Sequence, residues 1–355
     1  MTKNHNYFLD LAFQIAEKHL GNTKLNPAVG AVVVKNSAIV SSGVTSARGK
    51  AHAEFNALNK NYNFSGATLY TTLEPCIHHG QTPPCINIIK NKKIKKVFYS
   101  FNDPDPRTFK KSKEELKKNK IISKLVKSKN FNNFYDSYFY NKKFYLPYIS
   151  AKIAISKDYF SINKKSKWIT NEQSQKVTHL LRSKNDCIIS TSKSINKDNS
   201  LLNCRIDGLS KFNPDLFIID LNLNLKKNLM LNKLINKRKT FLITSVLNRK
   251  KINFYKKKGY KIININYLNS KNDFKLLFKY IYNLGYRRIF FETGLTFLNS
   301  LLKHKLLNKL YIFQNNTTLK NFGANNCTSK HLKKIKLKKK IQINLRNDSL
   351  YEKIF

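Results

Sequence analysis

Three residues with metal-binding side chains, His52, Cys76 and Cys85, stand out because their types and spacing suit a single metal ion. One imidazole and two thiols are good ligands for zinc, and three protein ligands leave the fourth tetrahedral position open for water. A structural zinc site is closed by four protein ligands, so this set predicts a catalytic site. Bound zinc lowers the pKa of water until hydrolysis is feasible near neutral pH.

Glu54 follows His52 by two residues and therefore cannot easily share its ligand direction. We expect its carboxylate to move protons between the attacking water, the substrate ring and the departing amine. The order His-x-Glu followed by Pro-Cys is the signature of zinc deaminases acting on amino-pyrimidine and purine rings. Each part alone is weak, because His-Ala-Glu is usually a solvated helical turn and two cysteines are usually free thiols. Their ordered combination favours the metal site.

The loop between the cysteines narrows the class of deaminase. Cys85 follows Cys76 by nine residues, a longer interval than nucleic-acid and nucleoside deaminases use. Thr72–Cys85 resembles, almost residue for residue, the motif of the bifunctional riboflavin-biosynthesis deaminase–reductase family. Asn26-Pro27-x-Val29-Gly30 is similar to the substrate-side loop of that family. The resemblance implies a zinc-dependent, cytidine-deaminase-like N-terminal domain.

The two histidines inside this loop, His78 and His79, are open to more than one interpretation. Either could bind zinc, but three ligands are already supplied and a catalytic site keeps one position open. We therefore expect both to be loop donors or substrate contacts.

The segments around these residues alternate between strand and helix patterns. The apolar run Val29–Lys35 predicts a buried strand, and Ala38–Val44 a second strand returning beside it. Two helices are expected to begin near the metal ligands, so that their N-termini converge on the site. The pattern predicts an α/β/α sandwich with further strands at 67–73 and 96–100 and helices at 6–20, 52–60 and 85–91. Asn102–Arg107 is expected to close the sheet, and 110–145 to form a helix and connection.

A chain of 355 residues suggests two domains, and we place their boundary between residues 145 and 146. The second half also alternates between strands and helices, and so predicts another α/β domain. It has no G-x-G-x-x-G fingerprint of a Rossmann fold. Expected strands are 148–158, 186–190, 216–220, 239–244, 260–265, 287–292 and 309–313, with helices at 171–183 and 297–303.

The second half resembles the reductase half of the same family, whose fold is similar to dihydrofolate reductase. The matching segments are Ser166-x-Trp168-Ile169-Thr170, Arg182, Asp198-Asn199-Ser200-x-Leu202-x-x-Arg205 and Glu292-Thr293-Gly294-Leu295-Thr296. The resemblance implies two sets of contacts. A ribosylamino-pyrimidine phosphate substrate would be held by Ser166, Arg182, Leu202, Arg205 and Glu292, and NADPH by Ala154, Trp168, Ser194, Asp198 and the turn at Gly294.

The second half departs from the family pattern at several positions. Thr293-Gly294-Leu295 replaces Gly-Gly-Pro, and the loss of a glycine could crowd the cofactor phosphates. Asp198-Asn199-Ser200 replaces Asp-Asp-Pro. One alternative is therefore a deaminase whose C-terminal half is only structural and supports a dimer.

The net charge of +47 raises a second alternative, a nucleic-acid-binding zinc deaminase. The lysines, however, are spread along the whole chain together with many asparagines, which a biased base composition also explains. No apolar run reaches the ~18 residues of a membrane span, and no signal-peptide core is recognisable. We therefore expect a cytoplasmic enzyme of riboflavin biosynthesis with a small-molecule substrate, no specific nucleic acid and no membrane partner; a homo-oligomer is left open.

Overall fold

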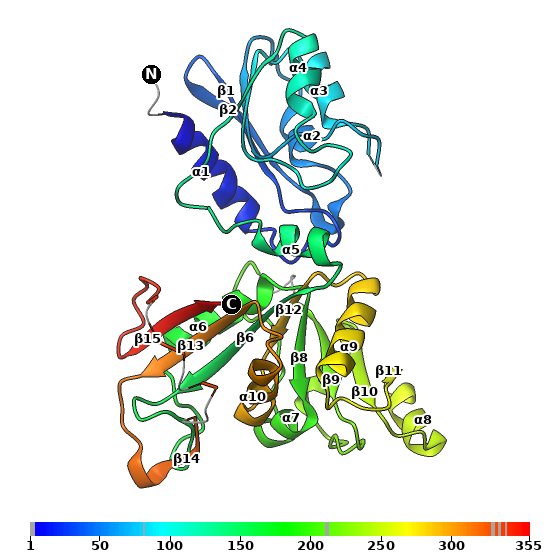
Figure 1. Ribbon diagram of the computed structural model, residues 1–355, viewed down its shortest axis with the longest axis vertical. Helices are drawn as coiled ribbons and strands as arrows, with labels where there is room; N and C mark the ends of the chain where they lie inside the picture. The colour runs from blue at the N-terminus through cyan, green and yellow to red at the C-terminus, as the bar shows by residue number, and fades with distance from the viewer. Residues whose placement is uncertain (1–3, 81, 210–212, 328–330, 333–334, 338) are drawn as a thin grey trace. The chain divides into compact units, whose positions relative to one another are not determined.

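The computed structural model describes residues 4–80, 82–209, 213–327, 331–332, 335–337 and 339–355. The chain folds into two compact units, Met1–Tyr145 and Leu146–Phe355 (Figure 1). Each unit has its own sheet, helices and hydrophobic core. The α/β class expected from the sequence is confirmed in both units.

The first unit contains a five-stranded sheet in the order β2-β1-β3-β4-β5. The predicted hairpin is confirmed, because β1 and β2 are antiparallel and joined by Asn36 and Ser37, both with positive φ. Two-residue hairpin turns of this kind require positive φ at both positions. The strands are β1 (Gly30–Lys35), β2 (Ala38–Val44), β3 (Thr68–Leu73), β4 (Lys96–Phe101) and β5 (Ile122–Leu125).

Helices cover both faces of this sheet, which confirms the α/β/α sandwich (Figure 1). Alternate residues of β1 point to opposite faces, as the pleat of a strand requires. Val32 and Val34 pack with Leu9 of α1, whereas Ala31 and Val33 belong to the core that α2 and α3 cover. The helices are α1 (Asn4–Glu17), α2 (Ala53–Leu58), α3 (Cys85–Asn91), α4 (Ser112–Lys118) and α5 (Asp136–Phe144).

The expectation for residues 102–145 was wrong in two respects. Asn102–Arg107 does not close the sheet, because β5 follows it and pairs in parallel with β4. The segment 110–145 contains α4, β5 and α5 rather than one helix and a connection. Strand β5 is short, lies at the edge and has mostly exposed side chains, so it lacks the hydrophobic alternation by which strands are recognised.

Gly43 on β2 is needed because α2 lies directly against it. A Cβ atom at this position would come within 2.4 Å of both the Ala53 oxygen and the Ala57 nitrogen. We expect Gly43→Ala to lower the free energy of unfolding of the first unit by about 1–3 kcal/mol, the usual cost of overpacking. Chemical denaturation measures this loss. The exposed neighbour Ser42 provides the control, since Ser42→Ala should change almost nothing; equal losses would contradict the argument.

The second unit contains an eight-stranded sheet in the order β11-β10-β9-β8-β12-β6-β13-β15, parallel except for β15. A separate antiparallel ribbon joins β7 (Phe160–Asn163) and β14 (Gly323–Asn326). The eight strands are β6 (Tyr148–Ile155), β8 (Cys187–Thr191), β9 (Asp215–Ile219), β10 (Thr240–Thr244), β11 (Lys261–Asn264), β12 (Arg288–Phe291), β13 (Lys309–Asn315) and β15 (Asp348–Ile354).

The helices of the second unit also cover both faces of their sheet. Helices α9 and α10 pack on one core, to which Phe274 and Leu298 belong, and Ile195 of α7 and Tyr255 of α8 belong to the other. The helices are α6 (Glu172–Ser183), α7 (Ser192–Asp198), α8 (Arg249–Lys257), α9 (Lys271–Asn283) and α10 (Leu295–Lys303). Short 3-10 helices also occur in both units: η1 (Ala47–Gly49) in the first, and η2 (Met230–Leu234) and η3 (Lys320–Phe322) in the second. Among the described residues, no helix is long and apolar enough to span a bilayer.

Candidate metal centre and reductase site

The three predicted metal ligands lie together in the first unit. His52 is the N-cap of α2, Cys76 follows the end of β3, and Cys85 is the first residue of α3. Their ligand atoms all lie within 4.8 Å of one another. His52 Nδ1 is 3.2 Å from Cys85 Sγ and 3.5 Å from Cys76 Sγ.

This donor set fits zinc. One nitrogen and two sulfurs at such separations can occupy three corners of a tetrahedron around one ion, which leaves the fourth corner for a small ligand. The backbone N–H of Cys85 donates to Cys76 Sγ over 3.2 Å. Hydrogen bonds from the Cys85 thiol and from His52 lower the pKa of Cys76 to about 4, which favours the thiolate that a metal needs.

Glu54 lies beside this cluster and is almost fully buried, with 3% of its surface exposed. Its Oε2 lies 3.4 Å from Cys85 Sγ, and its Oε1 faces the Thr71 hydroxyl at 3.5 Å. Burial raises the pKa of Glu54. The carboxyl group is therefore next to the three ligand atoms without belonging to their triangle.

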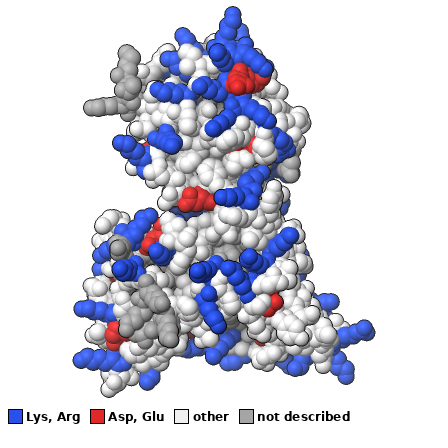
Figure 2. Space-filling view, viewed as in Figure 1, with Lys and Arg blue, Asp and Glu red and all other residues white. Residues whose placement is uncertain are grey.

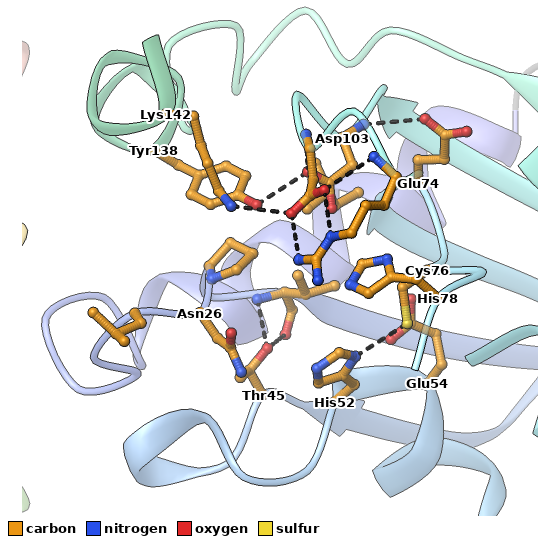
Figure 3. A pocket seen from close by; sticks show the side chains of 16 residues that line it. Asn26, Thr45, His52, Glu54, Glu74, Cys76, His78, Asp103, Tyr138 and Lys142 are labelled. Atoms are coloured by element: carbon orange, nitrogen blue, oxygen red, sulfur yellow. Dashed lines mark hydrogen bonds and ion pairs between the residues drawn. The ribbon is translucent and has the colours of Figure 1, made fainter. Parts of the chain in front are cut away.

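A pocket opens beside two of the candidate metal ligands, His52 and Cys76 (Figure 3). His52, Cys76 and Glu54 lie at one end, and Asp103, Tyr138 and Lys142 lie at the other. Asn26 and His78, which the sequence suggested as substrate-side residues, also line it; the exposed His79 is not among its lining residues. Gln81 of the same loop lies outside the described residues.

Sequence reasoning missed the far wall of this pocket. Asp105 accepts a forked pair of hydrogen bonds from Arg107, at 2.9 and 2.7 Å, and an ion pair from Lys142 at 3.1 Å. The Tyr138 hydroxyl donates to Asp103 over 3.0 Å. The acidic turn was visible in the sequence, but nothing local indicated that α5 would return to place Tyr138 and Lys142 here.

The cysteine ligands give a direct test of the metal centre. We expect Cys85→Ala to reduce bound zinc from about one ion per chain to a small fraction, because two protein ligands rarely hold zinc. Metal analysis of the purified protein measures this. Cys204→Ala removes a buried thiol of the second unit and should leave zinc unchanged. Full zinc occupancy in Cys85→Ala would contradict the assignment.

In the second unit, the structure joins two of the predicted substrate residues in a buried ion pair. Arg182 at the end of α6 donates to Glu292, which directly follows β12, through Nε at 2.5 Å and Nη2 at 2.9 Å. Both side chains are nearly buried, with 11% and 6% exposed. Burial alone would raise the pKa of Glu292, but the Arg182 guanidinium outweighs it and holds that pKa below its ordinary value.

Lys152 and His179 belong to the same cluster and were missed. Lys152 on β6 places its ammonium 3.9 Å from Glu292, and burial lowers its pKa. His179 lies one helical turn before Arg182, with Nδ1 3.2 Å from Arg182 Nη1, and burial lowers its pKa to about 4. The spacing of three residues between His179 and Arg182 on α6 was the available signal.

Leu202 and Arg205 lie on a loop that reaches the same cluster. The Asn203 oxygen accepts from Arg182 over 2.9 Å, and the Arg205 backbone N–H lies 3.3 Å from His179 Nδ1. Leu202 is buried, whereas the side chain of Arg205 is exposed. The structure thus brings Arg182, Glu292 and the loop of Leu202 and Arg205 together.

Two of the predicted NADPH contacts are also adjacent. Strands β8 and β12 are parallel neighbours, and Ser194 and Gly294 follow their ends. The Gly294 N–H donates to Ser194 Oγ over 3.1 Å. Leu295, where the family has proline, is buried in the core.

The remaining predicted residues are less closely joined. Ala154 lies on β6, the strand that carries Lys152. Asp198 is near enough for its negative charge to favour the protonated form of Lys152 and so to raise its pKa, against the effect of burial. Ser166 and Trp168 are exposed, and the Ser166 hydroxyl accepts from the Trp168 N–H at 3.3 Å. No described hydrogen bond or ion pair connects these two residues with Arg182 or Glu292.

Comparison with known proteins gives consistent matches in both units. The cytidine and deoxycytidylate deaminase zinc-binding region matches residues 2–101, and the RibD C-terminal domain matches residues 147–348. The riboflavin biosynthesis protein RibD of Aquifex aeolicus is 32% identical over 315 residues, which cover 86% of this chain and 85% of that protein. The RibD of Actinobacillus pleuropneumoniae is 28% identical over 313 residues, covering 86% and 82%.

Solved structures share the fold of the whole chain. Acinetobacter baumannii RibD superposes with a TM-score of 0.82 at 24% identity and covers 99% of both chains. A Thermotoga maritima protein, named as a diaminohydroxyphosphoribosylaminopyrimidine deaminase and 5-amino-6-(5-phosphoribosylamino)uracil reductase, gives 0.81 at 23% identity and covers 98% of this chain and 97% of its own.

Proposed function

The chain belongs to the family of the riboflavin biosynthesis protein RibD, and on that premise we propose a substrate and a role for each site residue. It is a bifunctional enzyme of riboflavin biosynthesis with a deaminase and a reductase activity, and its cofactors are zinc and NADPH. The proposed substrate is 2,5-diamino-6-(5-phosphoribosylamino)pyrimidin-4-one. Residues 1–145 would form the deaminase domain and residues 146–355 the reductase domain.

In the first unit, we assign Glu54 to proton transfer and His52, Cys76 and Cys85 to the metal. Bound zinc makes water nucleophilic near neutral pH. Glu54 would take a proton from the attacking water and deliver it to the departing amine, a transfer that its position beside the ligand atoms supports. Asn26 and His78, which line the pocket, would contact the pyrimidine substrate.

In the second unit, we assign the buried cluster to the ribosyl chain of the deaminated intermediate. Bound NADPH would supply the hydride for the ribosyl C1; the bond from C1 to the ring oxygen would break and that oxygen would take up a proton, which leaves an open ribityl chain. Glu292, oriented by Arg182, would accept hydrogen bonds from sugar hydroxyls. Arg205 has an exposed guanidinium that suits a phosphate ester. Ser166 and Leu202 would complete the substrate site.

The cofactor would lie beside the turn at Gly294, which begins the nine-residue helix α10. The first N–H groups of a helix are free to bind phosphate oxygens. Ser194, Ala154, Asp198 and Trp168 would supply the other contacts. Support for this assignment is strongest at Ser194, whose hydroxyl accepts a hydrogen bond from the Gly294 N–H.

One observation carries the deaminase proposal: a buried glutamate beside two thiols and an imidazole at zinc-binding separations. The test supplies three amines in turn to zinc-loaded protein without NADPH: the proposed pyrimidine, cytidine and deoxycytidylate. We expect ammonia from the first alone. Faster release from cytidine or deoxycytidylate would overturn the proposed substrate and leave the zinc chemistry intact.

On the face that Figure 2 shows, the distribution of charge does not mark out a nucleic-acid binding surface. Lysine and arginine side chains are scattered over the visible face of each unit and form no single stripe (Figure 2). We propose a small molecule as the partner, no specific nucleic acid, and a homo-oligomer as a state to be measured. A cytoplasmic location is part of the proposal. The three cysteines outside the metal centre, Cys187, Cys204 and Cys327, form no disulfide, which supports a reducing compartment.

A further inference from the structure

Arg238 carries a buried positive charge for which the deaminase and reductase assignments give no role. It lies between η2 and β10, and only 7% of its surface is exposed. Burial lowers its pKa to about 10, so the guanidinium remains protonated at neutral pH. Burying such a charge is costly unless it is paired or hydrogen-bonded.

The guanidinium of Arg238 donates hydrogen bonds to backbone carbonyl groups. Nη1 donates to the oxygens of Leu202 and Pro214, the latter at 3.2 Å, and Nη2 donates to the Leu201 oxygen at 2.5 Å. Among the described residues it forms no ion pair, and its Nε has no partner. The nearby Asp215 is occupied, because it accepts from the Lys239 N–H and the Tyr286 hydroxyl.

Two of these carbonyls belong to the loop that carries Arg205. Leu202 has a φ of +49°, a left-handed conformation that costs energy in a residue with a side chain. On the far side of Leu202, the Asn203 oxygen accepts from Arg182. Two buried arginines from separate parts of the chain therefore donate hydrogen bonds to three consecutive carbonyl groups of one loop.

The segment held by these hydrogen bonds, residues 201–203, lies just before Arg205 and limits the positions that the Arg205 side chain can take. Asn203 Oδ1 accepts from Arg205 Nη1 at 2.7 Å, so the fixed part of the loop also orients the exposed guanidinium. A forked guanidinium can bridge several carbonyl oxygens with a fixed geometry, which a lysine ammonium cannot reproduce. The strained loop conformation thus depends on a group whose described hydrogen bonds go to backbone oxygens and not to Arg205 or Glu292.

We propose that Arg238 is a positioning residue of the reductase, which holds residues 201–205 so that Arg205 meets the phosphate of the deaminated intermediate. The inference rests on the proposed function, because it takes Arg205 as a substrate contact. It predicts an effect on the affinity for the pyrimidine intermediate and none on the deaminase.

The test uses the full chain with Arg238→Lys and Arg238→Met. We expect Arg238→Lys to raise the KM for the deaminated intermediate by about tenfold, the equivalent of one lost hydrogen bond. The KM for NADPH and the rate of ammonia release should stay at wild-type values. Hydrogen exchange at the backbone amides of Cys204 and Arg205 should become faster by a similar factor. If Arg238→Met does not fold, Arg238→Lys carries the test alone.

Tyr255→Phe is the matched control. Tyr255 belongs to the same hydrophobic cluster as Leu202, and its hydroxyl donates to the Leu225 oxygen at 2.6 Å, away from the loop. It should leave both KM values unchanged. An equal rise of KM in this control, or an equal rise for NADPH in Arg238→Lys, would show a general loss of structure and overturn the inference.

Failure of the proposed function would be recognised separately. If the wild-type protein reduced no intermediate, the reductase assignment would fall, and hydrogen exchange would still decide whether Arg238 fixes the loop. Unchanged exchange at Cys204 and Arg205 in Arg238→Lys would overturn the positioning role whatever the activity.

Discussion

Glu54→Gln is expected to lower the rate of ammonia release by about 100-fold to 10,000-fold, the range that a positioned general acid–base contributes. The amide has nearly the shape of the carboxyl group but cannot take or deliver a proton. His52, Cys76 and Cys85 remain in place, so bound zinc should stay at its wild-type level. Rates of ammonia release and metal analysis on the same preparation measure both quantities.

Two controls separate proton transfer from burial. Glu74→Gln changes another buried carboxylate that lines the same pocket, but its oxygens accept the backbone N–H groups of Asp103, Lys110 and Ser112. It should cost stability but retain most of the deaminase activity. Glu54→Gln supplied with deaminated intermediate should still oxidise NADPH. Ammonia release at the wild-type rate in Glu54→Gln would remove Glu54 from the mechanism.

Arg182→Ala is expected to lower the free energy of unfolding of the second unit by about 3–5 kcal/mol, because it leaves the buried Glu292 without its main partner. It should also abolish reduction, since Glu292 and Asn203 both lose the group that orients them. Lys152, at 3.9 Å from Glu292, offsets part of the loss. Chemical denaturation and NADPH absorbance measure the two effects.

The cost of Arg182→Ala should depend on pH. In the wild type the Arg182 guanidinium holds the pKa of Glu292 below its ordinary value, so the ion pair stabilises the fold at neutral pH and its contribution is lost as the pH falls through that lowered pKa. In the variant, burial raises the pKa of Glu292. Its carboxylate is therefore protonated as the pH falls, and the unpaired buried charge disappears. The difference in stability between the two proteins should therefore shrink from pH 7 towards pH 4.

The exposed ion pair on the same helix is the control for Arg182→Ala. Lys176 and Glu172 lie four residues apart and are 67% and 72% exposed. Lys176→Ala should leave the free energy of unfolding almost unchanged at any of these pH values, because solvent screens an exposed pair. A loss as small as this in Arg182→Ala would show that the buried pair does not support the fold.

The metal site could be predicted from the sequence because its parts are close in the chain. Cys76 and Cys85 flank one loop, and His52 and Glu54 share the start of one helix, so residue type and spacing carried most of the information. Buried strands such as β1 were recognisable from their β-branched runs. Strand β5 was missed because its exposed, lysine-containing sequence has no hydrophobic pattern.

The missed site residues depend on long-range contacts. Lys142 meets Asp105 from a helix 37 positions later in the chain, and Arg182 meets Glu292 across 110 positions. Arg238 contacts Leu201 and Leu202 from more than 30 positions away. No local pattern marks such partners, since the path of the chain alone decides which side chains meet. The resemblance indicated Arg182 and Glu292 but not that they bind each other.

We expect both units to be active and to act in order, and a single coupled assay can show this. Zinc-loaded protein is incubated with the diamino-pyrimidinone ribosyl phosphate and NADPH, and ammonia and NADPH absorbance are followed in the same cuvette. We predict that ammonia appears first and that NADPH then falls by an equal amount. Ammonia release with constant NADPH would contradict an active reductase, and NADPH loss without ammonia would contradict the order.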